Sequence, residues 1–225
     1  MRYQKEINPL QAFLAKPDNR KWLIVTGGLL AIIITLSVIL AVTLSNGAAA
    51  SGAEQDPAAQ RPTVTDIDGI PLHTVFIPEG APGRPGIQRT VTSITIHETA
   101  NPNEGADAQA HSDYLTTTSD EVSWHYTVDD HEIYQHLPDN EEAWHSGDRE
   151  GNHSSIGIEL CVNSDGDFDK TMENAAKLTA FLLKEYHLTM DDVKQHYDFN
   201  GKDCPLTIRE TGRWDEFLGM VEKNL

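Results

Sequence analysis

One uncharged stretch near the N-terminus limits what this chain can fold into. Residues 23–44 read LIVTGGLLAIIITLSVILAVTL and contain no Asp, Glu, Lys or Arg. About 20 apolar residues suffice for a helix to cross the hydrocarbon core of a bilayer, and Trp22 stands where indole rings favour the interface. We therefore predict a short segment at residues 1–21 and a transmembrane helix at residues 22–44, so that only the later residues form a folded domain.

The charges that flank this stretch predict its orientation. Residues 1–21 contain five Lys or Arg, whereas residues 45–68 contain only Arg61. Positive flanks stay on the cytoplasmic side, so we expect a single-pass protein of the cell membrane with its N-terminus in the cytoplasm and the rest outside. The alternative is a secreted chain, cut at the small residues of NGAAASGA. Signal peptides have apolar cores of only about 7–15 residues, which favours the anchor.

The residues after the apolar stretch change in composition. Residues 45–62, SNGAAASGAEQDPAAQRP, are small, polar and interrupted by Gly and Pro, which is typical of a flexible linker. A folded domain is then expected over residues 63–225. The formal net charge is −18, and because residues 1–21 are positive, the rest is more acidic still. This charge favours solubility and argues against nucleic acid or anionic lipid as partners of the domain.

Strand and helix patterns alternate along residues 63–225. Runs of β-branched and aromatic residues predict strands at 91–97, 122–128, 132–137 and 156–162. The middle two are separated by Asp129-Asp130-His131, so they are expected to form a hairpin. Apolar residues at helical spacing predict helices at 106–117, 170–187 and 213–224. Interleaved strands and helices predict a single α/β domain with a central mixed β-sheet flanked by helices.

Two histidines and a cysteine lie in contexts that favour metal binding. His97 ends the apolar strand Ile94-Thr-Ile, where a side chain is held rigidly. His196 and Cys204 follow one another closely, with Gly201 between them to let the loop fold back. Two imidazoles and one thiolate leave an open position on zinc, as catalytic zinc sites do. The sequence therefore predicts a Zn²⁺ site at His97, His196 and Cys204, and an enzyme.

Two charged residues complete the candidate site. Glu159 lies in the otherwise apolar strand Ile156-Gly-Ile-Glu, and a buried carboxylate must be paired, bound or functional. Lys202 is two residues before Cys204, where its ammonium could stabilise an oxyanion. The alternatives are a salt bridge for Glu159 and a solvated loop position for Lys202.

A second cysteine leaves another interpretation open. Cys161 shares the strand face of Glu159 by the two-residue period. A disulfide between Cys161 and Cys204 is allowed outside the cell, and it would remove a metal ligand. The enzyme would then work only under reduction.

Several short strings resemble one enzyme family. The region from about residue 70 to residue 214 resembles the zinc-dependent N-acetylmuramoyl-L-alanine amidases of the amidase-2 type, which are related to phage lysozyme-type amidases and peptidoglycan recognition proteins. The matching strings, in chain order, are Arg84-Pro-Gly, Ile94-Thr-Ile-His97-Glu-Thr, Gly105-Ala-Asp-Ala108, Ser123-Trp-His-Tyr126, Ala143-Trp-His145-Ser-Gly147, Gly151-Asn152, Ile156-Gly-Ile-Glu159 and Lys202-Asp-Cys204-Pro205.

The resemblance implies an activity and roles for residues. It implies zinc-dependent hydrolysis of the amide bond between N-acetylmuramic acid and L-alanine in peptidoglycan. It implies that His97, His196 and Cys204 bind the zinc and that Glu159 and Lys202 are catalytic. The residues implied to line the substrate groove are His125, His145 and Asn152.

One position departs from the family pattern. Phage lysozyme-type members carry a tyrosine just before the residue matched by His125, and this chain has Trp124 there. We therefore expect Trp124 beside the substrate and more of the proton transfer on Glu159. The alternative function is a non-catalytic peptidoglycan-binding module of the same fold, which usually lacks the third metal ligand, and Cys204 is present here.

Overall fold

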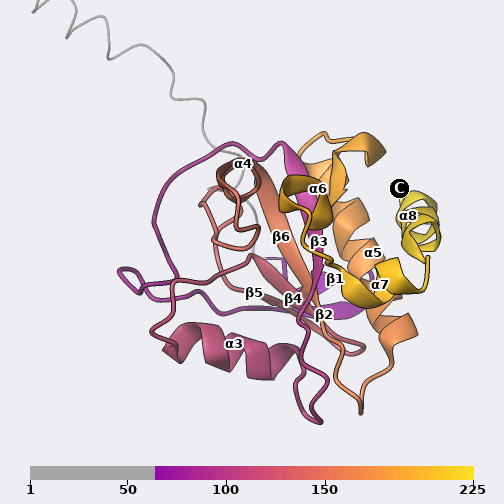
Figure 1. Ribbon diagram of the computed structural model, residues 1–225, viewed down its shortest axis with the longest axis horizontal. Coiled ribbons are helices and arrows are strands. Elements are labelled where there is room, and N and C mark those ends of the chain that lie inside the picture. The colour runs from indigo at the N-terminus through magenta and orange to yellow at the C-terminus, as the bar shows by residue number, and fades with distance from the viewer. Residues whose placement is uncertain (1–63) are drawn as a thin grey trace, which may run out of the picture. The chain divides into compact units, whose positions relative to one another are not determined.

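The structure is a computed structural model that describes residues 64–225 (Figure 1). The predicted cytoplasmic segment, transmembrane helix and linker fall on residues 1–63 and lie outside the described residues. Within residues 64–225, every helix is too short or too polar to cross a bilayer. The membrane anchor therefore stays a prediction.

A mixed seven-stranded sheet forms the centre of the domain (Figure 1). Its order is β1-β2-β5-β4-β6-β3-β7. Strand β3 lies between β6 and β7 and is parallel to both, while β4 is parallel to β6 and antiparallel to β5. The strands are β1 (Asp66–Ile67), β2 (Ile70–Thr74), β3 (Ser93–Glu98), β4 (Tyr126–Val128), β5 (Ile133–Gln135), β6 (Ser155–Leu160) and β7 (Val193–Gln195). The predicted α/β class with a mixed sheet is confirmed.

The four predicted strands all form, and the predicted hairpin is present. Strands β4 and β5 pair antiparallel, with Tyr126 opposite Gln135. The first of these strands is shorter than predicted: β4 begins at Tyr126, and Ser123 N donates to the Trp144 carbonyl instead of to a neighbouring strand. Strands β1, β2 and β7 were not predicted, since two to five residues carry little periodic signal.

The three predicted helices form with small shifts at their ends. The longest, α5 (Phe168–Glu185), begins two residues earlier than predicted because the Asp167 carboxylate caps it by accepting from Lys170 N at 3.1 Å. The remaining helices are α3 (Ala108–Thr117), α4 (Arg149–Ser154), the 3₁₀ helix η3 (Met190–Asp192), α6 (Tyr197–Asn200), α7 (Leu206–Glu210) and α8 (Trp214–Lys223).

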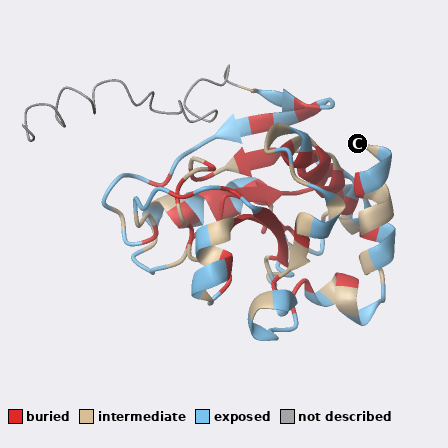
Figure 2. Cartoon of the chain, turned by 90° about the horizontal axis from the view of Figure 1, so that it is seen from above, coloured by how far each residue is buried: buried red, intermediate tan, exposed pale blue. Residues whose placement is uncertain are grey.

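The two faces of the sheet differ in chemistry. Ile94 and Ile96 of β3 and Ile158 of β6 pack with the apolar stripe of α5, and Phe217 of α8 completes this core. Side chains alternate along a strand, so the intervening residues face the other way. Those residues are mostly polar, yet every residue of β3 and every residue of β6 except the half-buried Glu159 is buried, and Figure 2 shows the buried centre of the sheet. The sheet therefore presents a buried polar face opposite its apolar core.

One charged contact fixes the end of β3 to a later helix. Glu98, the last residue of β3, is 6% exposed, and its carboxylate accepts from Thr207 N at 2.8 Å and Ile208 N at 2.9 Å. These donors are free N–H groups in the first turn of α7, where a negative charge is favoured. The loop that carries Cys204 is thereby tied to the strand that carries His97.

The Glu98 contact generates a stability prediction. Changing Glu98→Gln replaces one acceptor oxygen by an NH₂ group that faces a backbone donor. A buried donor left without a partner costs about 1–3 kcal/mol, so the free energy of unfolding should fall by about that amount. Urea denaturation measures it. The control is Glu222→Gln, on the exposed side of α8, and equal stability of the two variants would contradict the prediction.

A second prediction concerns pH. Burial, helped by the charge of His111, lowers the pKa of His136 to about 3, whereas the unfolded chain binds that proton near its usual pKa of about 6.5. Between these values only the unfolded state is protonated, so stability falls as pH falls. In His136→Gln, the loss of unfolding free energy between pH 7 and pH 5 should be smaller by about 2 kcal/mol.

Urea denaturation at both pH values, with chelator present throughout, tests this. Gln keeps an oxygen to accept from the Thr127 hydroxyl, which now lies 2.8 Å from His136 Nε2. The same pH slope in the wild type and the variant would show that His136 does not titrate on unfolding.

Candidate active site

The polar face of the sheet brings the predicted site residues together. His97 of β3 lies opposite Glu159 of β6, which in turn lies opposite Thr127 of β4. All three strands run in the same direction, so their side chains line up across the sheet. Strand β7 runs parallel to β3 on its other side and ends at Gln195, one residue before His196.

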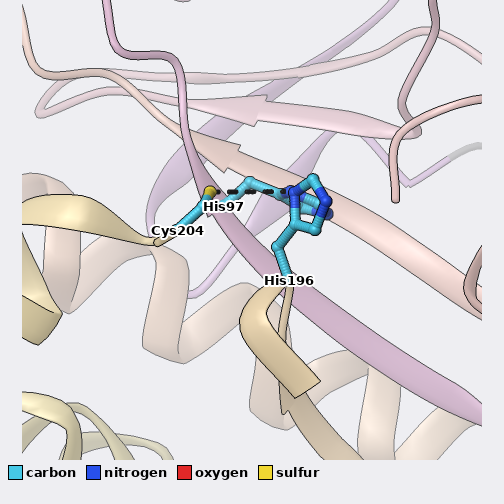
Figure 3. A group of neighbouring side chains, drawn as sticks. All are labelled: His97, His196 and Cys204. Carbon is cyan, nitrogen blue, oxygen red and sulfur yellow. Dashed lines mark hydrogen bonds between the residues drawn. The ribbon is translucent and has the colours of Figure 1, made fainter. Parts of the chain in front are cut away.

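Figure 3 shows the three predicted metal ligands pointing toward one another. His97 Nδ1 lies 3.0 Å from His196 Nδ1 and 3.8 Å from Cys204 Sγ. All three side chains are buried, and their donor atoms fall within 4.8 Å of one another. Cys204 reaches this place because the chain reverses after α6 at Gly201, which adopts a φ of 77° that favours glycine.

The chemistry of these donors fits zinc. Two imidazole nitrogens and one sulfur are the ligands that zinc prefers, and three protein ligands leave a position open. Burial lowers the pKa of His97, so its imidazole is neutral and one of its two ring nitrogens keeps a lone pair. Burial also raises the pKa of the Cys204 thiol to about 12, so a thiolate forms here only where a cation compensates its charge. The described residues thus bring together three donors that could hold a metal ion, and their chemistry is that of a zinc site.

Glu159 lies beside this cluster with a free oxygen. Its Oε1 is 3.9 Å from His97 Nδ1, and its buried Oε2 has no hydrogen-bond partner. Burial raises the pKa of the Glu159 carboxyl to about 8, against the lowering effect of Lys202 and with a further rise from Glu98. A carboxyl whose pKa lies near neutral pH suits proton transfer in both directions.

Lys202 lies in the exposed loop between α6 and Cys204. Its backbone N donates to Asn200 Oδ1 at 2.9 Å, which fixes the loop. The ammonium is near enough for its charge to lower the pKa of Glu159, His97 and His196. The structure therefore places an exposed cation next to the cluster and not inside it.

His125 and Trp124 lie in the interior. His125 is fully buried, and its Nδ1 accepts from Gly157 N at 3.0 Å. The Trp124 indole N–H donates to the Thr127 hydroxyl at 2.6 Å. Both polar groups thus have partners within the protein, and their predicted contact with substrate stays a prediction.

His145 and Asn152 belong to one local network. The Asn152 side-chain oxygen accepts from His145 N at 3.0 Å, from Ser146 N at 2.8 Å and from the Ser146 hydroxyl at 2.9 Å. His145 Nδ1 lies 2.9 Å from His97 Nε2. The structure brings His145 next to the metal cluster, a name used here for the three candidate ligands His97, His196 and Cys204. Asn152 on α4 fixes the backbone of the loop that carries His145.

Sequence reasoning missed several neighbours of the site. Arg89 is 8% exposed, with Nη2 2.7 Å from His125 Nε2 and Nε donating to the Glu141 carbonyl at 2.9 Å. Burial lowers the pKa of this guanidinium to about 10. Arg89 precedes β3 in irregular chain, so no periodic pattern points to it. The sequence shows Glu98 as a polar residue after His97, but it does not indicate the contact of its carboxylate with α7.

The alternative disulfide does not form in this structure. Cys161 and Cys204 are both free and buried. Cys161 packs with Ala108 and Tyr134, and burial raises the pKa of its thiol. Cys204 is therefore available as a ligand, and Cys161 belongs to a small buried cluster.

Comparison with known proteins places this site in a family. Residues 87–207 match the Amidase_2 family, described as N-acetylmuramoyl-L-alanine amidase. The chain is 50% identical over 144 residues to the N-acetylmuramoyl-L-alanine amidase XlyA of Bacillus subtilis (strain 168), covering 63% of this chain and 48% of XlyA. It is 42% identical over 152 residues to the N-acetylmuramoyl-L-alanine amidase CwlH of the same strain, covering 66% of this chain and 60% of CwlH.

A solved structure agrees with these relatives. The structure of the catalytic domain of XlyA matches with a TM-score of 0.65 and 47% identity, covering 68% of this chain and 99% of that one. The chain spans about half the length of XlyA and three fifths of CwlH. The family match covers more than half of the chain and includes the metal cluster, Glu159 and Lys202. This chain is a member of the Amidase_2 family of N-acetylmuramoyl-L-alanine amidases.

Proposed function

We propose that this protein hydrolyses the amide bond between N-acetylmuramic acid and L-alanine in peptidoglycan, with Zn²⁺ held by His97, His196 and Cys204. The observation that carries the proposal is the convergence of these three donors beside a carboxyl with an unpartnered oxygen. The names of the relatives support the choice of substrate.

The metal ligands, Glu159 and Lys202 have different roles in the proposed reaction. Zinc, when bound, supplies a Lewis acid that polarises the scissile carbonyl and makes water a better nucleophile. Glu159 takes the proton of the attacking water and delivers it to the leaving amine of L-alanine. Its pKa of about 8 is close enough to neutral for both steps. Trp124 donates its only polar hydrogen to Thr127, so it leaves proton transfer to Glu159.

Lys202 supplies charge stabilisation. The carbonyl oxygen becomes negative as water adds, and an ammonium nearby lowers the energy of that state. Because Lys202 is exposed on a loop, its four-carbon stem can swing toward the bound substrate. Its charge already reaches Glu159 and both histidines of the cluster.

We further propose that the N-terminal apolar stretch anchors the protein in the cell membrane with this domain outside, or else directs its secretion. The acidic exterior offers no attraction to a polyanionic wall. Attachment to the membrane, and not electrostatic attraction to the wall, would then keep the enzyme near its substrate.

Replacing Glu159→Gln should remove the proton acceptor and keep the shape. Release of stem peptides with a free L-alanine amine should fall by roughly a hundredfold or more, with zinc content unchanged. Mass spectrometry of digested peptidoglycan and metal analysis measure the two quantities in the full-length protein. Glu222→Gln serves as the control and should keep full activity. Turnover that stayed intact after Glu159→Gln would refute the role of Glu159.

Removing the metal gives a separate test. A zinc chelator should abolish peptide release, and added Zn²⁺ should restore it. Cys204→Ser should lower the zinc content, since the thiolate is lost. Cleavage that persists in chelator would refute the metal site. Zinc that stays bound to a protein that pellets with the wall and never cuts it would identify the non-catalytic binding module.

A further inference from the structure

A third histidine, His145, lies against the metal cluster. A histidine that binds a metal through one nitrogen usually donates the N–H of the other to a carboxylate, a carbonyl or water. Here His97 Nε2 lies 2.9 Å from Nδ1 of His145. The two rings are nearly perpendicular, at 88°, with centroids 4.9 Å apart. An imidazole therefore occupies the place that an oxygen acceptor usually takes.

The surroundings of His145 decide which way this hydrogen bond runs. Its Nε2 lies 3.4 Å from the Ser155 carbonyl oxygen, and a carbonyl only accepts, so Nε2 carries the proton. A neutral imidazole has one N–H, which makes Nδ1 of His145 an acceptor. The shared proton then belongs to Nε2 of His97. The Nδ1 lone pair of His97 is left facing His196 and Cys204.

The position of the His145 ring is built into the fold. Asn152 holds the backbone of residues 145 and 146 through its side-chain oxygen. Below the ring, Gly157 of β6 leaves the space it needs, because a Cβ added there would lie 2.8 Å from His145 Cγ. So close a contact would force something to move. Two separate elements, α4 and β6, thus fix one imidazole against His97.

The resemblance to the family gives His145 a place in the substrate groove, and the contacts favour another role. The residue is 8% exposed. Both of its ring nitrogens are engaged, one by His97 and one by the Ser155 carbonyl. No ring nitrogen is then left to recognise a sugar or a peptide.

We propose that His145 is a positioning residue, which accepts the Nε2–H of His97 and so fixes the His97 tautomer that presents Nδ1 to the metal. This inference rests on the proposed zinc site. It assigns His145 a role in metal affinity and not in substrate affinity.

The first experiment compares two substitutions at this position in the full-length protein. In His145→Asn, the amide oxygen sits where Nδ1 was and still accepts from His97. In His145→Leu, the volume is kept and the acceptor is lost. Zinc affinity, measured by competition with a chromophoric chelator and without substrate, should fall about 10–100-fold for Leu and stay within a few-fold of the wild type for Asn. His136→Leu is the control, since it removes a buried histidine bonded to Thr127.

The second experiment reads the tautomer directly. Nitrogen-15 spectra of the histidine rings should show His97 protonated at Nε2 in the wild type, with or without zinc. The Leu variant should show a mixture of tautomers in the zinc-free protein. This wild-type measurement needs neither catalysis nor a folded Leu variant, so it separates a failure of this inference from a failure of the proposed amidase activity.

Two results would overturn the proposal. One is His97 protonated at Nδ1 in the zinc-free wild type. The other is a Leu variant that binds zinc as tightly as the wild type while its KM for peptidoglycan rises, which would return His145 to the substrate groove.

Discussion

Parallel pairing of β3 with β6 and β7 is the constraint on which the site depends. It brings His97 opposite Glu159 and sets His196 one residue beyond the end of the neighbouring strand. Strand pairing fixes these residues through the evenly spaced backbone hydrogen bonds of a parallel ladder. The third ligand, Cys204, is the exception. It arrives on a loop, and the loop needs the turn at Gly201 and the Glu98 contact with α7 to reach the same place.

The buried polar face has an energetic cost that its contacts offset. Buried imidazoles are tolerated when they are neutral and hydrogen-bonded, and burial lowers the pKa of His125, His136 and His145. Each of them also has a partner: Gly157 N, the Thr127 hydroxyl and His97. Neutral histidines next to a metal cluster add no positive charge that would oppose the cation. The same burial that makes this face costly therefore prepares it for metal binding.

Much of this arrangement was predictable from the sequence, for identifiable reasons. The apolar runs of β3 and β6 and the long periodic stripe of α5 are strong local signals, so the α/β fold followed from them. His97 and Glu159 stood out because each is a polar residue in an otherwise apolar strand, and His196 and Cys204 because they lie close together on either side of Gly201. The contacts behind them were hidden. That His145 meets His97, or that Arg89 meets His125, depends on segments 48 and 36 residues apart folding together, and no local pattern encodes it.

Adjacent residues at the end of β3 face opposite sides of the sheet. His97 serves the metal cluster, and Glu98 clamps α7 on the other side. A slip of one residue in the pairing of β3 would exchange these faces, so the ligand and the clamp would be lost together. Bound metal would therefore report the register of β3. The metal content of the folded protein would distinguish correctly paired molecules from compact, misregistered ones, which a measurement of helix content alone would not distinguish.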